Sequence, residues 1–374
     1  MRIGIDARFI QGPNTGVTNY LVNLIKALER IDRDNDYTLF LSDPDYAGRL
    51  RQGSRFKVIV KEASALFWKN VWLPKQARKL KIDVMHFPAY TCPFVKVKNS
   101  VVTVHDLVHK VNPRWFSLRE LILIGLPITI AIRKAAKIIA VSESTKRDIM
   151  KFYGVKEDKI AVTLEAADST FRPINDQAAL EDIRSKYKLG INFILYVGVL
   201  FKRRNIQRLI EAFLLMQKDK ELPGYQLVIA GPGKDYFDLQ GLLDRYKLRD
   251  RVSYLGYVDQ QDLPLLYNAA SFFVYPSLYE GFGLPVLEAM SCGKAVITSN
   301  VSSLPEITGE AGILIDPYST EELYQAMRRL GQDNGLRERL GDLALERSRN
   351  FSWEKMARQT LEVYQQAAGN RKGD

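Results

Sequence analysis

Cysteine and histidine are scarce in this chain. Its 374 residues include two cysteines, Cys92 and Cys292, which lie far apart in the sequence, and three histidines. This scarcity excludes a disulfide framework and a cysteine-based zinc site, and it favours a protein of the reducing cytoplasm. Since so few ligating side chains remain, we expect no catalytic metal and no cofactor.

Long hydrophobic runs are also missing. A transmembrane helix requires about 18 or more consecutive apolar residues, and the longest run, 121–132, is shorter and is bounded by Glu120 and Arg133. Its length fits either a core helix or a segment that lies on a membrane. The chain begins M-R-I-G-I-D-A-R, which predicts a buried first strand rather than a cleavable signal.

Acidic residues are outnumbered only in the first half of the chain. Residues 1–168 contain 28 Lys and Arg against 17 Asp and Glu, which accounts for the whole net charge of +11. Such an excess indicates an anionic partner or surface, namely nucleic acid, acidic lipid or a phosphorylated substrate, unless it serves only solubility.

The excess is greatest in residues 49–81, where basic side chains flank an aromatic and apolar cluster. The cations are Arg49, Arg51, Arg55, Lys57, Lys61, Lys69, Lys75, Arg78, Lys79 and Lys81. The cluster contains Leu66, Phe67, Trp68, Val71, Trp72 and Leu73. Because cations bind lipid phosphates while aromatic rings sit at the headgroup boundary, the pattern predicts docking on an anionic membrane. Alternatively, the aromatic residues belong to the core or to an acceptor cleft.

Short β-rich runs alternate with helical patterns along the whole chain, which predicts two α/β, doubly wound domains with parallel sheets. Strands are expected at 3–7, 37–41, 57–60, 84–87, 100–104, 138–141 and 160–163, then at 193–198, 226–230, 252–255, 272–275, 295–298 and 312–315. Helices are expected over 17–30, 205–216 and 353–367.

The alternation restarts after residue 168, so the domains are expected over 1–168 and 169–352, with a linker at roughly 165–190. The final segment, 353–374, is expected to pack back on the first domain. Ligands of open parallel sheets bind at the carboxyl ends of the strands. Motifs that follow strands are therefore the candidate site residues, and the two domains are expected to face each other across a cleft.

The most specific motif, Y-E-G-F-G-L-P-V-L-E-A-M over residues 279–290, links an apolar strand to a helix. Gly281 and Gly283 permit a tight turn that leaves space for a ligand close to the backbone, and the start of the helix attracts an anion. Glu280 can accept hydrogen bonds from sugar hydroxyls, and Glu288 can accept them from a ribose diol. The alternative is that both glutamates are solvated surface acids.

A second motif, Y-V-G-V-L-F-K-R-R-N-I over residues 196–206, follows the first strand of the second domain. Its three consecutive cations beside a helix start suit a diphosphate, because arginine makes bidentate phosphate contacts that neutralise charge. We assign this role jointly to Arg203 and Arg204. The alternative is a plain basic run on the surface.

Two further motifs lie in the first domain. In V-T-V-H-D-L, His105 stands just beyond an apolar strand, where it can hydrogen-bond a sugar hydroxyl or serve the fold, and Asp106 either orients it or caps the next turn. The small-residue loop 11–17 can approach a ligand through its backbone. It lacks the G-x-G-x-x-G pattern, which counts against NAD or FAD.

Three sequence segments resemble the signature of the family-four retaining glycosyltransferases. They are E-G-F-G-L-P-V-L-E-A-M over 280–290, C-G-K-A-V-I-T-S over 292–299 and L-P-E over 304–306. The similarity covers nearly the whole chain and is greatest to bacterial mannosyltransferases of O-antigen, capsule or exopolysaccharide synthesis. It implies a GT-B fold, in which the N-terminal domain holds the acceptor and the C-terminal domain holds a nucleotide-sugar donor.

The resemblance also implies roles for individual residues. The catalytic residues are His105, Glu280, Arg203 and Arg204. The donor-binding residues are Gly16, Gly198, Arg203, Arg204, Tyr257, Val258, Glu280, Gly281, Phe282, Gly283, Leu284 and Glu288. The acceptor side comprises Asn14, Thr15 and Asp106. Two departures are visible: the family usually has lysine at the place of Arg204, and some members have arginine at the place of Val199, so one phosphate contact is lost here.

The resemblance implies transfer of a hexose to a glycan or lipid-linked saccharide. The expected donor is GDP-mannose, which supplies mannose, and UDP-sugars are the next candidates. Retention by front-face attack without a metal is expected, since no Asp-x-Asp metal motif stands in a matching context. The alternatives are a sugar-nucleotide 2-epimerase, which uses no acceptor, and a basic nucleic-acid-binding protein, although the chain has no recognisable nucleic-acid motif. The expected location is the cytoplasm, with peripheral binding to the inner face of the plasma membrane.

Overall fold

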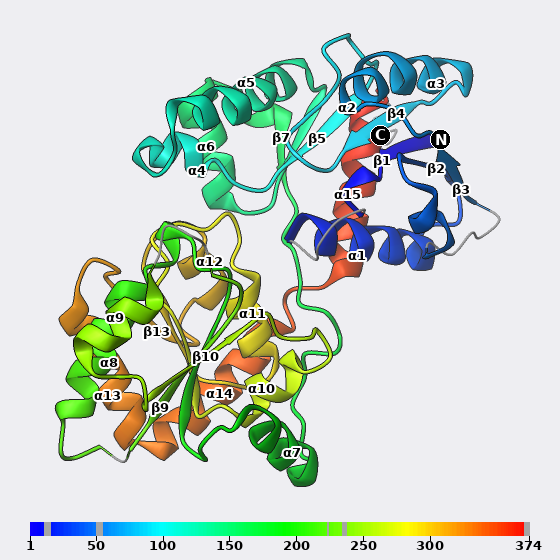
Figure 1. The fold of residues 1–374 in the computed structure, drawn as a ribbon. Helices are drawn as coiled ribbons and strands as arrows, with labels where there is room; N and C mark the ends of the chain where they lie inside the picture. Colours follow the sequence, from blue (N-terminus) through cyan, green and yellow to red (C-terminus); the bar gives the residue numbers. More distant parts are fainter. Residues whose placement is uncertain (11–15, 50–54, 223, 234–237, 370–374) are drawn as a thin grey trace. The chain divides into compact units, whose positions relative to one another are not determined.

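The computed structural model describes residues 1–10, 16–49, 55–222, 224–233 and 238–369 (Figure 1). The chain divides into two compact units. Unit 1 comprises Met1–Glu165 and Ser352–Asp374, and unit 2 comprises Ala166–Phe351. The first transition therefore precedes the boundary expected at residue 168 by three residues, and the C-terminal segment is part of unit 1.

Unit 1 is built on a parallel sheet with the strand order β3-β2-β1-β4-β5-β6-β7. Its strands are β1 (Arg2–Asp6), β2 (Asp36–Leu41), β3 (Phe56–Val60), β4 (Val84–Phe87), β5 (Ser100–Val104), β6 (Lys137–Ala140) and β7 (Ile160–Val162). Every residue of β4 and β5 is buried. Continuous burial of this kind is typical of central strands in a sheet that is covered on both faces.

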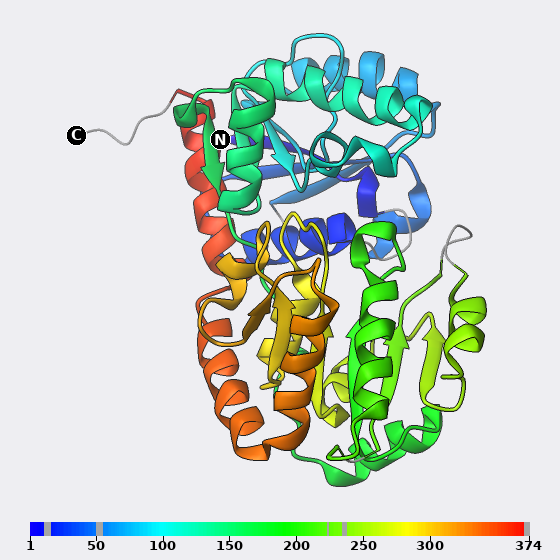
Figure 2. The same cartoon turned by 90° about the vertical axis from the view of Figure 1, so that its left-hand side faces the viewer.

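The helices of unit 1 include three of 15 or more residues, α1, α5 and α15. The helices are α1 (Gly16–Ile31), α2 (Ala65–Phe67), α3 (Leu73–Lys79), α4 (Val108–Val111), α5 (Leu118–Lys134), α6 (Glu143–Tyr153) and α15 (Trp353–Ala367). A π-helical turn, Trp68–Trp72, joins α2 to α3. Helices α1 and α15 pack against each other (Figures 1 and 2), and Arg30 forms a 3.1 Å ion pair with Glu354 between them.

A chain of buried polar groups also fixes α15 to the sheet. The Tyr364 hydroxyl lies 2.7 Å from His86 Nδ1, and His86 Nε2 lies 2.8 Å from Thr103 Oγ1. Thr103 in turn lies 3.1 Å from the hydroxyl of Tyr20 in α1. Burial lowers the pKa of His86 to about 3, so the imidazole is neutral and serves the fold.

Unit 2 repeats the architecture, with the parallel strand order β10-β9-β8-β11-β12-β13. Its strands are β8 (Phe193–Val197), β9 (Gln226–Ala230), β10 (Val252–Gly256), β11 (Phe272–Tyr275), β12 (Val296–Ser299) and β13 (Ile313–Ile315). Its helices are α7 (Gln177–Tyr187), α8 (Ile206–Lys218), α9 (Leu239–Tyr246), α10 (Leu263–Ala269), α11 (Leu284–Ser291), α12 (Leu304–Thr308), α13 (Thr320–Gln332) and α14 (Asn334–Ser348).

The predicted organisation into two α/β domains is confirmed. Each expected strand corresponds to a strand of the structure. The linker prediction over 165–190 is wrong in its second half, because α7 lies there. Asp176 caps this helix by accepting a 3.1 Å hydrogen bond from the amide of Ala179, and Leu180 and Ile183 are buried three residues apart on one face. That short apolar pattern was the signal that the sequence interpretation missed.

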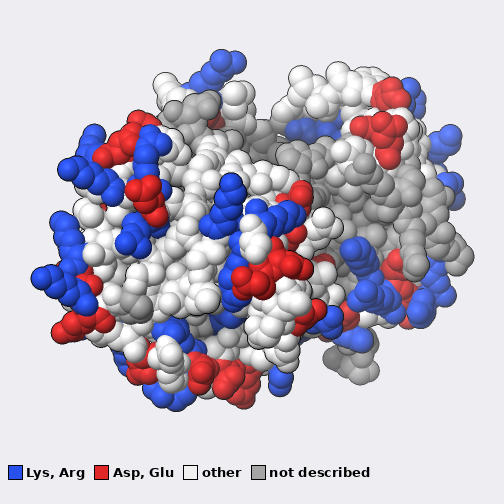
Figure 3. All heavy atoms as spheres, turned by 60° about the horizontal axis from the view of Figure 1, so that its bottom comes forward, with Lys and Arg blue, Asp and Glu red and all other residues white. Residues whose placement is uncertain are grey.

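Charge is balanced in the second half of the chain, where residues 169–374 contain 26 basic and 26 acidic side chains. On the face shown in Figure 3, Lys and Arg are interspersed with Asp and Glu. Within the described ranges, no helix is both long and apolar enough to cross a membrane.

Candidate functional site

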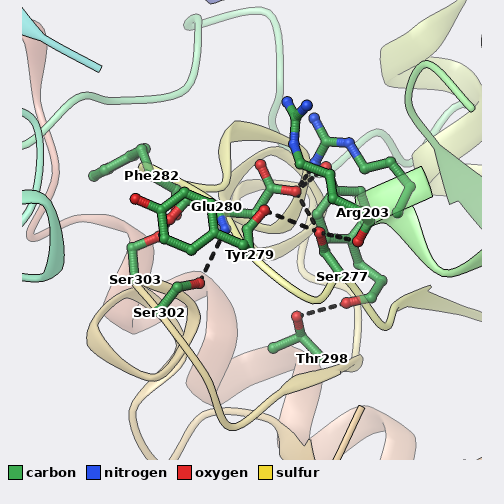
Figure 4. Close-up of polar contacts among 10 residues, drawn as sticks. Arg203, Ser277, Tyr279, Glu280, Phe282, Thr298, Ser302 and Ser303 are labelled. Atoms are coloured by element: carbon green, nitrogen blue, oxygen red, sulfur yellow. Dashed lines mark hydrogen bonds and ion pairs between the residues drawn. The ribbon is translucent and has the colours of Figure 1, made fainter. Parts of the chain in front are cut away.

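The loop between β11 and α11 holds Glu280 in a fixed position. Glu280 is 6% exposed, and its Oε1 accepts a 2.6 Å hydrogen bond from Ser277 Oγ (Figure 4). The same oxygen accepts a 3.3 Å hydrogen bond from the Tyr275 hydroxyl. The same oxygen is ion-paired with the guanidinium of Arg204. Three donors on one oxygen fix the orientation of the carboxylate and stabilise its negative charge.

A second loop, which follows β12, fixes the backbone on either side of Glu280. Ser302 Oγ accepts a 3.0 Å hydrogen bond from the Glu280 amide, and Ser303 Oγ donates one of 3.1 Å to the Glu280 carbonyl (Figure 4). Ser303 also bonds the carbonyl of Phe282. The sequence interpretation missed both serines, since only the fold brings their loop against residues 280–282.

Gly283 ends the turn and is the N-cap of α11. Its φ of +119° belongs to the region that favours glycine, and a Cβ there would lie 2.9 Å from Leu304 Cδ2. Because Leu284 is the first residue of α11, the positive end of the helix dipole lies beside Gly281 and Phe282.

The basic motif, Lys202–Arg204, follows strand β8 and contacts the loop that contains Glu280. Lys202–Arg204 forms a 3-10 turn between β8 and α8. The Arg203 carbonyl oxygen accepts a 2.7 Å hydrogen bond from the Leu278 amide and lies 3.1 Å from Ser277 Oγ. The Arg203 guanidinium lies 4.8 Å from the centre of the Phe201 ring. The structure thus brings together two motifs separated by more than 70 residues, and it pairs Arg204 with Glu280.

Two glycines allow the loops after β8 and β9 to meet. Gly198 has φ +153° and Gly231 has φ +133°, and a Cβ on Gly231 would lie 2.2 Å from the Gly198 carbonyl oxygen. Gly198, a predicted donor-binding residue, therefore lies where the backbones of the two loops are in contact, a few residues before the basic turn Lys202–Arg204. Tyr257 and Val258 follow β10 in the next loop of the sheet, where Tyr257 is 68% exposed and Val258 is buried.

Glu288 lies within α11, and its Oε2 accepts a 2.9 Å hydrogen bond from the hydroxyl of Tyr267. Part of the side chain reaches the surface, but protein surrounds the carboxyl group. This desolvation raises the pKa of Glu288 to about 7, although the Tyr267 hydrogen bond opposes the rise. The carboxyl group of Glu288 therefore changes its charge near neutral pH.

In unit 1, His105 follows β5 and is buried. Its Nδ1 lies 3.2 Å from Glu165 Oε1, and its Nε2 lies 2.8 Å from the Pro88 carbonyl oxygen. The ring is flanked edge-on by Tyr20, with centroids 4.9 Å apart. Asp106 accepts a 3.3 Å hydrogen bond from the amide of Val108, the first residue of α4.

The remaining predicted residues are at the first helix. Gly16 is exposed and is the first residue of α1, whereas Asn14 and Thr15 lie outside the described residues. In the part of the chain that the structure describes, no group of three or more His, Cys, Asp or Glu side chains is arranged to hold a metal ion.

Comparison with known proteins assigns this architecture to a class. Residues 14–168 match the model described as Glycosyltransferase Family 4, and residues 181–347 match Glycosyl transferases group 1. The solved structure of sucrose-phosphate synthase from Thermosynechococcus elongatus aligns over 98% of both chains, with a TM-score of 0.77 and 22% identity. These matches confirm the GT-B fold expected from the sequence.

Relatives of known sequence narrow the class further. The chain is 31% identical to the O-antigen chain mannosyltransferase B of Escherichia coli, over 97% of this chain and 99% of that protein. It is 30% identical to the serotype-specific mannosyltransferase WbdA of Escherichia coli over 71% of this chain, which corresponds to 33% of WbdA. The chain therefore belongs to the family 4 glycosyltransferases, and the expectation of sugar transfer is confirmed.

Proposed function

We propose that the chain transfers mannose from GDP-mannose to a glycan or lipid-linked saccharide, with retention of configuration and without a divalent ion. The observation that supports this most is the pairing of Arg204 with Glu280 next to Arg203 and the start of α11. The arrangement combines a fixed acceptor for sugar hydroxyls with cationic groups for a diphosphate. The mannosyltransferase relatives favour mannose.

Each site residue of unit 2 has a role in this proposal. Arg203 and Arg204 hold the diphosphate and stabilise its charge as it departs. Glu280 accepts hydrogen bonds from the donor sugar, and the ionised Glu288 accepts them from the ribose. Tyr257 and the backbone of Val258 lie beside the base.

The reaction proposed is a front-face substitution at the anomeric carbon. The bond from this carbon to the phosphate oxygen breaks while the acceptor hydroxyl oxygen forms the new bond on the same face. The hydroxyl proton passes to the departing phosphate oxygen. Because Glu280 Oε1 is already held by three donors, Glu280 serves as a hydrogen-bond acceptor here rather than as a nucleophile.

A thermal-shift screen against GDP, UDP, ADP and dTDP, each free and linked to a sugar, tests the donor. A ligand that binds only the native state raises its stability in proportion to ln(1 + [L]/Kd). We expect the largest shift with GDP and GDP-mannose. A larger shift with a uridine nucleotide would contradict the choice of base.

The raised pKa of Glu288 predicts pH-dependent donor binding. The carboxylate accepts hydrogen bonds from ribose hydroxyls only while it is ionised, so the affinity for GDP-mannose falls as the pH drops through about 7. Between pH 8 and pH 6 we expect Kd to rise about tenfold, as for one group of that pKa. Calorimetric titration checks this. Glu288→Gln should bind weakly with no such slope, and an unchanged slope in that variant would contradict the assignment.

The structure revises the predicted membrane-docking cluster. Trp68 and Leu73 are fully buried, as the alternative of core residues required, whereas Leu66, Phe67 and Val71 are exposed. Asn70 Oδ1 of the same segment accepts a 2.8 Å hydrogen bond from the amide of the exposed Phe94. The surface part of the cluster therefore continues onto the loop that contains Phe94.

Helix α5 extends this surface. Lys134, at the end of α5, donates a hydrogen bond to the Phe94 carbonyl, and Lys69 lies 5.2 Å from the Phe94 ring centre. The second half of α5 is buried through Ile128, Ala131 and Ile132. Its first half exposes large aliphatic side chains: Leu118, Ile122, Leu123, Ile124 and Leu126.

We propose that α5, the Phe94 loop and residues 66–71 dock on an anionic membrane. The first domain binds a lipid-linked acceptor there. Exposed apolar patches of this kind mark interaction sites, and the surrounding cations match acidic headgroups. This location at the inner face of the plasma membrane accounts for the basic character of the first half.

Co-sedimentation with phosphatidylglycerol vesicles checks the docking surface. Binding should fall with salt, and Lys69→Glu with Lys75→Glu should reduce it more than about tenfold, since each basic side chain near an acidic leaflet contributes about 1 kcal/mol. Leu123→Glu should reduce it as well, whereas Leu343→Glu, at an exposed leucine of unit 2, should not. Protein that stays in the supernatant at low salt would refute the docking proposal.

A further inference from the structure

Both nitrogens of the buried His105 ring face oxygen atoms. Nδ1 lies 3.2 Å from Glu165 Oε1, and Nε2 lies 2.8 Å from the Pro88 carbonyl oxygen. The side chains of His105 and Glu165 are 10% and 4% exposed. Glu165 was not among the residues that the sequence motifs singled out.

The Pro88 carbonyl determines the state of Nε2. A carbonyl oxygen can only accept a hydrogen bond, so Nε2 must carry a proton to satisfy it. Nδ1 can then either donate to an ionised Glu165 or accept from a protonated Glu165. In both cases Nε2 is a hydrogen-bond donor, and the position of the shared proton does not change this conclusion.

Glu165 supplies the other anchor of the ring. Contacts at both nitrogens hold the plane of the imidazole, which also packs edge-on against Tyr20. Glu165 is also the last residue of unit 1 before the chain continues into unit 2 at Ala166. The His105 imidazole therefore contacts the residue at which the chain leaves unit 1.

We propose that Glu165 is a positioning residue for His105, which keeps Nε2–H oriented as a donor to a sugar oxygen. The proposal rests on the proposed function and on the sugar contact that the sequence motif predicts for His105. In the reaction, the Nε2–H group would be shared between the Pro88 carbonyl and a hydroxyl or ring oxygen of the substrate. His105 then acts as a hydrogen-bond donor and does not accept the proton of the acceptor hydroxyl at Nε2.

Long-range ¹H–¹⁵N spectra of the imidazole groups test the geometry without any turnover. The chain has three histidines, so His105 can be assigned by comparison with His105→Gln. We expect a protonated Nε2 in the wild-type protein. A His105 ring that is protonated only at Nδ1 would overturn the proposal, and this result is independent of whether sugar transfer is observed.

Steady-state kinetics test the positioning role itself. Glu165→Ala should lower kcat about tenfold or more, as small misplacements of reacting groups do, with little change in the donor KM. Glu165→Gln should stay close to the wild type, because its amide N–H can donate to Nδ1 while Nε2–H is retained. Equal losses in both variants, or no loss in either, would overturn the proposal.

Two controls separate positioning from folding. Glu157→Ala removes an exposed carboxylate that pairs with Lys146 at 2.8 Å on the surface of the same unit, and it should leave kcat unchanged. In a His105→Ala background, Glu165→Ala should cause no further loss, since Glu165 acts through the imidazole. Additive losses there would overturn the proposal, and if Glu165→Ala fails to fold, the wild-type spectrum and Glu165→Gln still decide.

Discussion

Replacing Arg203 with alanine lowers kcat for mannosyl transfer by roughly 30- to 1000-fold, equivalent to about 2–4 kcal/mol of activation free energy. The reason is that the departing diphosphate loses a charge-stabilising donor, which no metal ion replaces in this account. Arg204→Ala should cause a similar loss of rate. It should also lower the free energy of unfolding by about 3 kcal/mol, because it removes one ion pair of the buried Glu280 carboxylate.

Initial rates and thermal unfolding of the two variants separate these effects. Lys218→Ala, at the far end of α8, is the matched control and should change neither rate nor stability. All of the active proteins should retain their rates in excess EDTA. Loss of wild-type activity in EDTA that Mn²⁺ restores would contradict the assignment of charge stabilisation to the arginines.

Glu280→Gln should lower kcat by about 100-fold while the Kd for GDP stays within a few-fold of the wild type, since one charge-assisted hydrogen bond to the sugar is weakened at the transition state. The ion pair with the partly buried Arg204 is lost in this variant, so a lower melting temperature is expected as well. Kinetics with GDP-mannose, calorimetry with GDP and thermal unfolding measure the three quantities.

The control for this variant is Glu310→Gln, which removes an exposed carboxylate in unit 2 and should alter none of them. A Glu280→Gln protein that transfers mannose at the wild-type rate would contradict the role proposed for this residue. Loss of GDP binding with unchanged turnover would instead place Glu280 at the nucleotide.

Much of the fold follows from local sequence patterns. The buried strands β4, β5 and β11 are short, mostly apolar runs bounded by polar residues or proline, and this pattern predicts them without any tertiary information. Motifs at the carboxyl ends of strands in both units could likewise be identified, because parallel sheets place their functional loops at that edge.

What the sequence could not reveal depends on contacts between distant segments. The Arg204–Glu280 pair joins residues 76 positions apart, and the Glu165–His105 contact joins residues 60 apart. No local pattern indicates which residue a side chain will meet across such a separation. For the same reason, the sequence could not distinguish the buried Trp68 from its exposed neighbour Phe67.

The configuration of the product shows whether transfer proceeds with retention and without a divalent ion. The protein is incubated with GDP-α-mannose, a mannose-terminated acceptor and excess EDTA, and the anomeric signals of the first product are followed by NMR. We expect an α-mannoside from the earliest time points, formed at a rate that EDTA does not change. A β-mannoside, or a reaction that begins only after a divalent ion is added, would contradict it.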